Sequence, residues 1–64
     1  MTIKEVRRGE YFTLKEVEYP TDRQVYVRGE YDRSERAYWC YKWHDVNDGR
    51  FFKGTRKAYT DFVF

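Results

Sequence analysis

Aromatic side chains dominate the apolar residues of this chain. Of 64 residues, 14 are aromatic (5 Phe, 7 Tyr and 2 Trp), whereas the branched aliphatic residues are only Ile3, Leu14 and six valines. Each aromatic side chain buries about 150–250 Å², so a few of them can build the core of a very small domain. Fourteen are more than one such core needs. The sequence therefore predicts that some rings stay exposed, where they are available for binding.

The chain lacks the residues that staple most very small domains. It has one cysteine and one histidine, so it has no internal disulfide and cannot supply the four ligands of a structural zinc site. We expect a single small β domain, residues 1–64, that is held together by packing or by self-association. We expect no metal and no cofactor.

Short apolar patterns separated by turn residues predict an all-β fold. Thr2 and Glu5 have the spacing of a capping box, which indicates one short N-terminal helical turn. Five strands are predicted, at residues 10–19, 24–32, 37–46, 50–53 and 58–64. Gly29 within the second strand indicates a bulge, and residues 47–49 (Asn-Asp-Gly) predict a hairpin turn. The expected fold is a five-stranded antiparallel meander or a small SH3-like or OB-like barrel.

The orientation of residues 37–46, which hold both tryptophans, decides which rings are exposed. We expect Val25 and Val27 to face the core, and the length of the next loop then sets the following strand. A four-residue loop, residues 33–36, turns the even-numbered side chains from Tyr38 to His44 inward. A loop of three or five residues turns the odd-numbered side chains from Trp39 to Trp43 inward.

A third arrangement places a bulge near Lys42. Tyr38, Cys40 and Trp43 then face inward, whereas Trp39 and Tyr41 are exposed beside Tyr26 and Arg28. The cost of burying a lysine disfavours the four-residue loop, because it turns Lys42 inward. The other two arrangements remain equal alternatives.

Cys40 and His44 are the only pair that suggests nucleophilic catalysis, with Asp45 or Asp61 to orient the imidazole. In an extended strand, residues four apart lie about 13 Å apart, so the thiol and the imidazole cannot form a hydrogen bond. We therefore expect no catalytic residue and no enzymatic activity.

The basic residues are unevenly distributed. Residues 1–32 carry six Lys and Arg against seven Asp and Glu, a net charge of −1, whereas residues 33–64 carry seven against four, a net charge of +3. Cations that alternate with aromatic rings favour an interaction surface, and we expect it to include the following residues: Tyr26, Arg28, Trp39, Tyr41, Lys42 and Lys53.

Two classes of partner fit such a surface. Exposed Tyr, Trp and Arg are enriched at protein interfaces, so a protein-binding adaptor, regulator or inhibitor that uses this face or a strand edge, or self-association, is the favoured function. Nucleic acid is the alternative, with bases stacked on the rings and phosphates held by Lys and Arg; the near-neutral net charge of +2 disfavours it. No apolar run is long enough to cross a membrane and residues 1–12 lack a signal sequence, so we expect no membrane association and a cytoplasmic location.

Three stretches carry a resemblance: residues 6–12 (VRRGEYF), residues 25–47, and FFKG at 51–54 followed by FVF at 62–64. In these the chain resembles small uncharacterised proteins of gut bacteria and their phages or mobile elements. The resemblance implies a regulator or inhibitor of host machinery, and it brings no catalytic residue.

Overall fold

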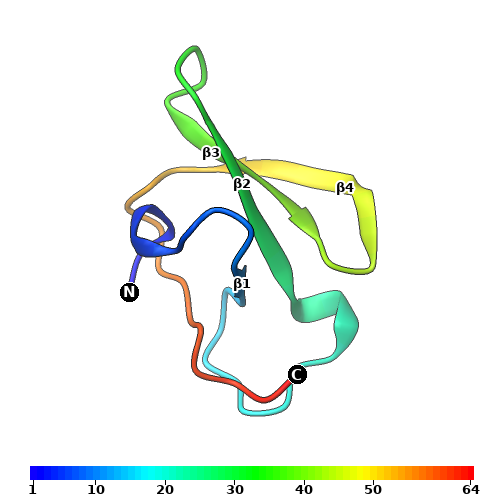
Figure 1. Cartoon of the computed structure of the whole chain (residues 1–64). Helices are drawn as coiled ribbons and strands as arrows, with labels where there is room; N and C mark the ends of the chain where they lie inside the picture. Colours follow the sequence, from blue (N-terminus) through cyan, green and yellow to red (C-terminus); the bar gives the residue numbers. More distant parts are fainter.

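A computed structural model of the protein describes all residues from 1 to 64, and its strands form one antiparallel sheet (Figure 1). In chain order the elements are a 3-10 turn η1 (Ile3–Glu5), strand β1 (Tyr11–Phe12), a 3-10 turn η2 (Asp22–Gln24), and strands β2 (Tyr26–Asp32), β3 (Ala37–Lys42) and β4 (Asp45–Phe52). The strand order β1-β2-β3-β4 follows the sequence, so every strand pairs with its neighbour in the chain. No helix in the structure reaches the length and hydropathy that a membrane span requires.

The predicted all-β class is confirmed, but the predicted fifth strand and the closed barrel are not found. Residues 58–64 make only one bridge to the sheet region, in which Thr13 and Tyr59 exchange two backbone hydrogen bonds of 2.9 and 3.0 Å. The Thr13 hydroxyl donates to the Lys15 carbonyl at 2.7 Å, and the chain bends there. Because β1 ends at Phe12, the C-terminal segment has no long strand to pair with, and the sheet stays open.

The predicted N-terminal helical turn is confirmed. The backbone N–H and the hydroxyl of Thr2 both donate to the Glu5 carboxylate, at 2.9 and 3.1 Å, while the Glu5 N–H donates to the Thr2 carbonyl. Thr21 and Gln24 repeat this arrangement at η2, where the Thr21 N–H donates to the Gln24 side chain at 2.9 Å. The reciprocal bonds satisfy donors that a short helical turn otherwise leaves unpaired.

The core lies on one face of the sheet, which we call the inner face, and it is built around three rings. The ring of Tyr26 stacks on Phe12 at 5.6 Å between centroids and meets the edge of Phe52 at 5.4 Å. Residues from η1 and from the segment after β4 cover these rings, and the full cluster is Ile3, Val6, Phe12, Tyr26, Cys40, Phe52 and Ala58. Three of these seven residues are aromatic, so a few rings form the centre of the core, as expected.

The pairing of β2 with β3 decides between the three arrangements of residues 37–46. Asp32 pairs with Ala37 across a four-residue loop, and a bulge at residues 29–30 shifts the register between Arg28 and Tyr31. Tyr38, Cys40 and Lys42 consequently lie on the inner side and Trp39 and Tyr41 face outward, as in the disfavoured arrangement with a four-residue loop. A second register shift does fall between Tyr41 and Lys42 in the β3–β4 ladder.

Two orientations expected for the arrangement with a bulge near Lys42 are wrong. Trp43 lies in the β3–β4 turn, 44% exposed, instead of in the core. Tyr26, expected beside Trp39 on the exposed face, is on the inner face and 6% exposed, whereas Val27 is buried on the opposite face, where it pairs with Tyr41. Both faces of β2 are covered at this point, so the simple alternation of buried and exposed residues does not hold.

The predicted turn at residues 47–49 is also wrong. The tight turn is Trp43–His44, because Lys42 already pairs with Asp45. Gly49 pairs with Tyr41, so residues 46–48 form a bulge within β4, where the Asn47 N–H donates to the Asp45 carboxylate at 3.0 Å. The Asn-Asp-Gly sequence thus marks a bulge within β4 and not the turn between β3 and β4.

Candidate interaction surfaces

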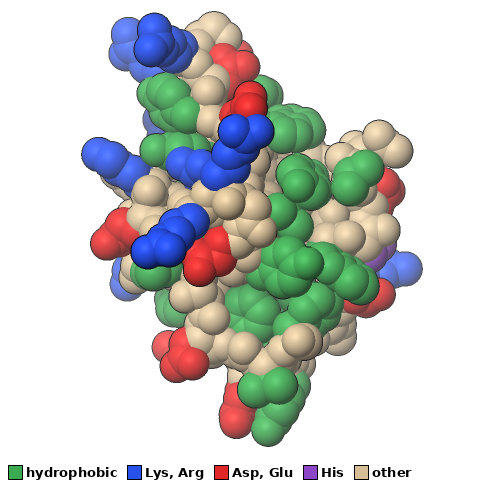
Figure 2. Space-filling view, viewed as in Figure 1, with side chains coloured by type: hydrophobic (Ala, Val, Ile, Leu, Met, Phe, Trp, Pro, Cys, Tyr) green, Lys and Arg blue, Asp and Glu red, His purple; other side chains and the backbone are tan.

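Six aromatic side chains lie on the face of the sheet opposite the core or at its margin. We call this set the outer aromatic face; it consists of Tyr11, Trp39, Tyr41, Trp43, Phe51 and Phe64. The rings meet edge to face: Trp39 contacts Phe51 at 5.0 Å between centroids, and Phe64 contacts Trp43 at 5.0 Å and Tyr11 at 6.1 Å. Figure 2 shows hydrophobic side chains gathered over the sheet and down to the C-terminus, with most Lys and Arg side chains set to one side of them.

Trp39 is the centre of this face because both neighbouring strands place a glycine beside it. Gly29 lies in the bulge of β2, and a methyl group there would collide with the Trp39 carbonyl oxygen. Gly49 on β4 lies under the indole, and a methyl group there would collide with the ring. The indole therefore lies close to the sheet while remaining 36% exposed.

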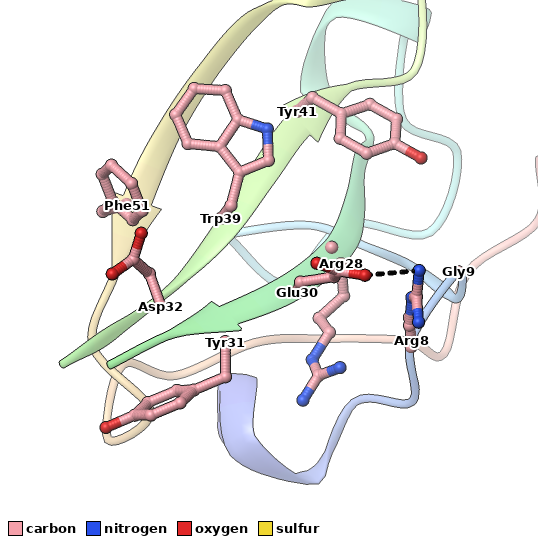
Figure 3. Close-up of a pocket in the computed structure, with 10 residues that line it drawn as sticks. Arg8, Gly9, Arg28, Glu30, Tyr31, Asp32, Trp39, Tyr41 and Phe51 are labelled. Atoms are coloured by element: carbon pink, nitrogen blue, oxygen red, sulfur yellow. Dashed lines mark ion pairs between the residues drawn. The ribbon is translucent and has the colours of Figure 1, made fainter. Parts of the chain in front are cut away.

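A shallow pocket of about 440 Å³ opens beside Trp39, between its ring and the bulge of β2. Its aromatic lining residues are Tyr31, Trp39, Tyr41 and Phe51, and its charged lining residues are Arg8, Arg28, Glu30 and Asp32. In Figure 3, Trp39 and Tyr41 rise from one side of β3, whereas the side chains of Arg28 and Tyr31 point to the other side. We call this the Trp39 pocket.

The charged residues that line the Trp39 pocket balance, Arg8 and Arg28 against Glu30 and Asp32, but the Arg28 guanidinium is directed over the ring of Tyr38. Arg8 is neutralised by an ion pair with Glu30, whose nearest atoms are 2.7 Å apart. Asp32 accepts hydrogen bonds on one carboxylate oxygen from the Ser34 hydroxyl (2.6 Å) and from the backbone N–H groups of Ser34 and Glu35. The bond from the Ser34 hydroxyl, with those from the backbone, lowers the pKa of Asp32, so the carboxylate stays ionised and its second oxygen remains available.

Three of the six predicted surface residues, Arg28, Trp39 and Tyr41, line the Trp39 pocket. Tyr26 is buried, so its ring is not available for stacking. Lys53 follows β4 and lines a different pocket, with Tyr31 and Tyr38.

Arg28 and Lys42 point toward the inner side of the sheet, away from Trp39. The Arg28 guanidinium lies over the ring of Tyr38, 4.2 Å from its centroid, and its Nε is buried without a hydrogen-bond partner. The Lys42 ammonium lies 5.3 Å from the centroid of Tyr26 and donates to the Arg23 carbonyl at 3.1 Å. Both cations therefore pack against aromatic rings of this side, in cation–π geometry.

Phe51 and Asp32 line the Trp39 pocket but were not in the predicted surface. Phe51 lies next to the inward-facing Phe52, so strand alternation alone would have placed it on the exposed face. Ser34 follows Asp32 by two residues, a spacing at which an Asp side chain often caps a turn. This spacing is the sequence signal from which the ordered carboxylate of Asp32 could have been predicted.

The thiol and the imidazole do not form a reactive pair. Cys40 is fully buried, and burial raises the pKa of its thiol to about 11. His44 is exposed in the β3–β4 turn. No group of three or more His, Cys, Asp or Glu side chains is arranged to hold a metal ion.

No protein-family model, no curated protein and no solved structure matches the chain.

Proposed function

We propose that this protein is a non-enzymatic protein-binding module whose outer aromatic face receives a cationic side chain, Lys or Arg, from a partner protein. The observation that carries the proposal is the Trp39 pocket, in which the exposed rings of Trp39 and Phe51 and the half-buried ring of Tyr41 lie near the ionised carboxylate of Asp32. Tyr, Trp and Phe are enriched at protein interfaces, where a few central rings supply most of the binding free energy.

The charges around the Trp39 pocket favour a cation over an anion. Arg8 is already paired with Glu30, and the side chains of Arg28 and Lys42 lie on the other side of the sheet. A Lys or Arg side chain from a partner would meet ring faces and the free oxygen of Asp32 together. Contacts of this kind are worth about 0.5–2 kcal/mol each, with the larger values where water is excluded.

The same charges disfavour nucleic acid on the outer aromatic face. Bases could stack on Trp39 and Phe51, but phosphates would meet Asp32 and Glu30, whereas Arg8 is paired with Glu30 and the Arg28 guanidinium is directed over Tyr38. Any nucleic-acid contact is therefore better sought on the side of the sheet that holds Lys53, where no acidic side chain lines the pocket.

A peptide titration followed by tryptophan fluorescence tests the proposal. The test uses two peptides that have the same leucine and tyrosine residues. The basic peptide has Lys and Arg at the positions where the acidic peptide has Glu. We expect the basic peptide to bind at least about tenfold more tightly, and Trp39→Leu to weaken binding by a similar factor. Asp32→Asn retains the acceptor for Ser34 but removes the charge, so it should also weaken binding of the basic peptide. Tyr19→Ala, at a ring that is 69% exposed away from the pocket, serves as the matched control.

Two results would contradict this function. Equal binding of the two peptides, or an Asp32→Asn variant with unchanged affinity, would remove the role of the carboxylate. Light scattering tests whether the outer aromatic face binds a second copy of the chain. A dimer of the native protein that dissociates in the Trp39→Leu variant would show that it does.

A further inference from the structure

A second pocket, of about 420 Å³, lies on the inner side of the sheet, near the loop between β2 and β3. Three separate segments form it: η1 contributes Lys4, the β2–β3 hairpin contributes Tyr31, Arg36 and Tyr38, and the end of β4 contributes Lys53. Its remaining lining residues are Gly54 and Thr55. We call it the Tyr31 pocket; every charged residue that lines it is a cation.

The segments that form the Tyr31 pocket are held together by the backbone. The Lys4 N–H donates to the Gly54 carbonyl at 3.1 Å. A methyl group at Gly54 would lie 3.1 Å from the Tyr38 ring and 3.2 Å from the Cβ of Lys4, so these three residues are closely packed. The pocket is therefore an ordered part of the fold, although its cations come from positions up to 49 residues apart in the sequence.

Lys4, Arg36 and Lys53 carry charge that no carboxylate neutralises. The only ion pair of the protein is that between Arg8 and Glu30, and it borders the other pocket. Arg36 has a φ of 53°, the left-handed conformation that a non-glycine residue rarely adopts. Three cations without a carboxylate partner surround this pocket. They favour an anionic ligand, because each can form a charge-assisted hydrogen bond with it.

Tyr31 adds a flat apolar surface to these charges. Its side chain is 50% exposed, and its ring meets Tyr38 at 4.9 Å between centroids with an angle of 62°. The Arg28 guanidinium lies 4.2 Å from the Tyr38 centroid, and Tyr31 packs against the same ring. Tyr31 is therefore the supported, exposed ring, and the one on which a planar group can stack.

We propose that the Tyr31 pocket binds nucleotides of single-stranded nucleic acid, with a base stacked on Tyr31 and the adjoining phosphates held by Lys4, Arg36 and Lys53. A free ring next to unpaired cations matches the way small β domains hold single strands, because every base has a ring face and every linkage a charge. A duplex does not fit this arrangement, since its bases are stacked on one another. Tyr31 is the only residue that also lines the Trp39 pocket, and its ring packs on Tyr38 on the inner side, so this inference stands without the proposed function.

The test is a fluorescence-anisotropy titration of a labelled ten-residue oligothymidylate at 50 mM salt, where phosphate contacts are strongest. We expect Lys53→Gln combined with Arg36→Asn to weaken binding at least about tenfold and to make it less dependent on salt, by about 0.7 in slope for each phosphate that the variant no longer neutralises. Asn is suited to the left-handed conformation at position 36. The matched control is Lys15→Gln combined with Arg23→Gln, which removes two exposed cations outside this pocket and should change affinity little.

Tyr31 separates base stacking from simple charge attraction. Tyr31→Phe should retain the affinity of the native protein, whereas Tyr31→Leu should lose about five- to a hundredfold, the usual range for one stacked base. Thermal unfolding followed by circular dichroism verifies that each variant is folded. Competition by thymidine monophosphate distinguishes a site for one nucleotide from a site for a strand. If the pocket binds a strand, the mononucleotide should displace the oligonucleotide only at concentrations far above that of the oligonucleotide.

Any of three outcomes would overturn the inference. The first is no binding of the oligonucleotide at 50 mM salt. The second is equal affinity of the Tyr31→Leu and native proteins, which would leave only non-specific attraction of a polyanion. The third is displacement of the oligonucleotide by a phosphotyrosine peptide at lower concentration than by unlabelled oligothymidylate, which would assign the pocket to phosphorylated protein.

Discussion

Trp39 lies over Gly49 of the neighbouring strand, at the centre of the outer aromatic face. A methyl group at Gly49 would overlap the indole and would also lie 2.9 Å from the Cys40 carbonyl oxygen. Tyr41 pairs with Gly49, and Trp39 pairs with Phe51, so the indole extends diagonally across the ladder. The position of the Trp39 indole is thus set by the absence of a side chain at Gly49 on β4.

Gly49→Ala should displace the indole while leaving the strands paired. Overpacking of this kind costs about 1–3 kcal/mol, and here the backbone oxygen of Cys40 limits relaxation on one side of the methyl group. We expect a lower free energy of unfolding in urea, a shift of the tryptophan emission maximum, and weaker binding of the basic peptide.

Asp48→Ala is the matched control, because Asp48 is the exposed neighbour within the same bulge. It should leave the emission spectrum unchanged. A Gly49→Ala variant with native stability and native emission would mean that Trp39 does not rest on this glycine.

Tyr26 should act as a core residue and not as a binding residue. Its ring joins Phe12 to Phe52 and is 6% exposed. Replacing a buried aromatic residue by alanine costs about 3–5 kcal/mol, which equals the whole stability expected of a domain this small. Tyr26→Ala should therefore be unfolded at 25 °C, whereas Tyr26→Phe keeps the ring and should remain folded.

Near-ultraviolet circular dichroism and urea denaturation measure this difference. Tyr19→Ala removes a ring that is 69% exposed and should have little effect on stability. If Tyr26→Ala were folded but failed to bind an oligonucleotide or peptide, Tyr26 would belong to the binding surface after all.

The sequence was sufficient to predict those parts of the fold that depend on local chemistry. The helical turn at Thr2–Glu5 needs only reciprocal side-chain and backbone bonds, and the bulge at Gly29 needs only a residue without a side chain. The prediction of a fifth strand was wrong because strand pairing depends on residues far apart in the sequence. Residues 58–64 have strand-like composition, but β1 is too short to pair with them. The turn at Trp43–His44 was not predicted, because it follows from the pairing of Lys42 with Asp45 and not from the turn preference of residues 47–49.

The candidate surfaces were predicted less well than the fold class. Alternation along one strand left the orientation of Trp39 and Tyr41 open; both face outward, with Trp39 36% exposed and Tyr41 half-buried. Alternation along one strand could not show that Tyr26 has Phe12 above it, because Phe12 lies 14 residues earlier in the chain. The Tyr31 pocket was beyond prediction for the same reason, since Lys4 and Lys53 meet only through the backbone contact of η1 with Gly54.

Glu5 should stabilise the protein only while it is ionised. The hydrogen bond from the Thr2 backbone, with that from the Thr2 side chain, lowers the pKa of Glu5 from its ordinary value of 4.5. Its contribution is therefore present above pH 4.5 and is lost as the pH falls through the lower folded pKa. Glu5→Gln keeps an acceptor for Thr2, so the difference in urea midpoint between native protein and variant should shrink from pH 7 to pH 3. Glu16→Gln, at an exposed carboxylate outside η1, is the control; a difference that grows on acidification would contradict the assignment.

Cys40 should make the protein less stable in alkali and should react slowly with thiol reagents. Burial raises its pKa from 9.0 to about 11, so the folded state keeps the neutral thiol over a range in which the unfolded chain ionises. The stabilisation is complete below pH 9 and is lost as the pH rises through about 11. We expect the free energy of unfolding to fall more steeply over this range in the native protein than in Cys40→Ala, which removes the ionising group but keeps the tyrosines and lysines that titrate nearby. At pH 8 a disulfide reagent should label the native thiol only at the rate at which the sheet opens, and the urea-unfolded chain at once; equally fast labelling of both would show that the thiol is accessible and that its surroundings do not exclude water.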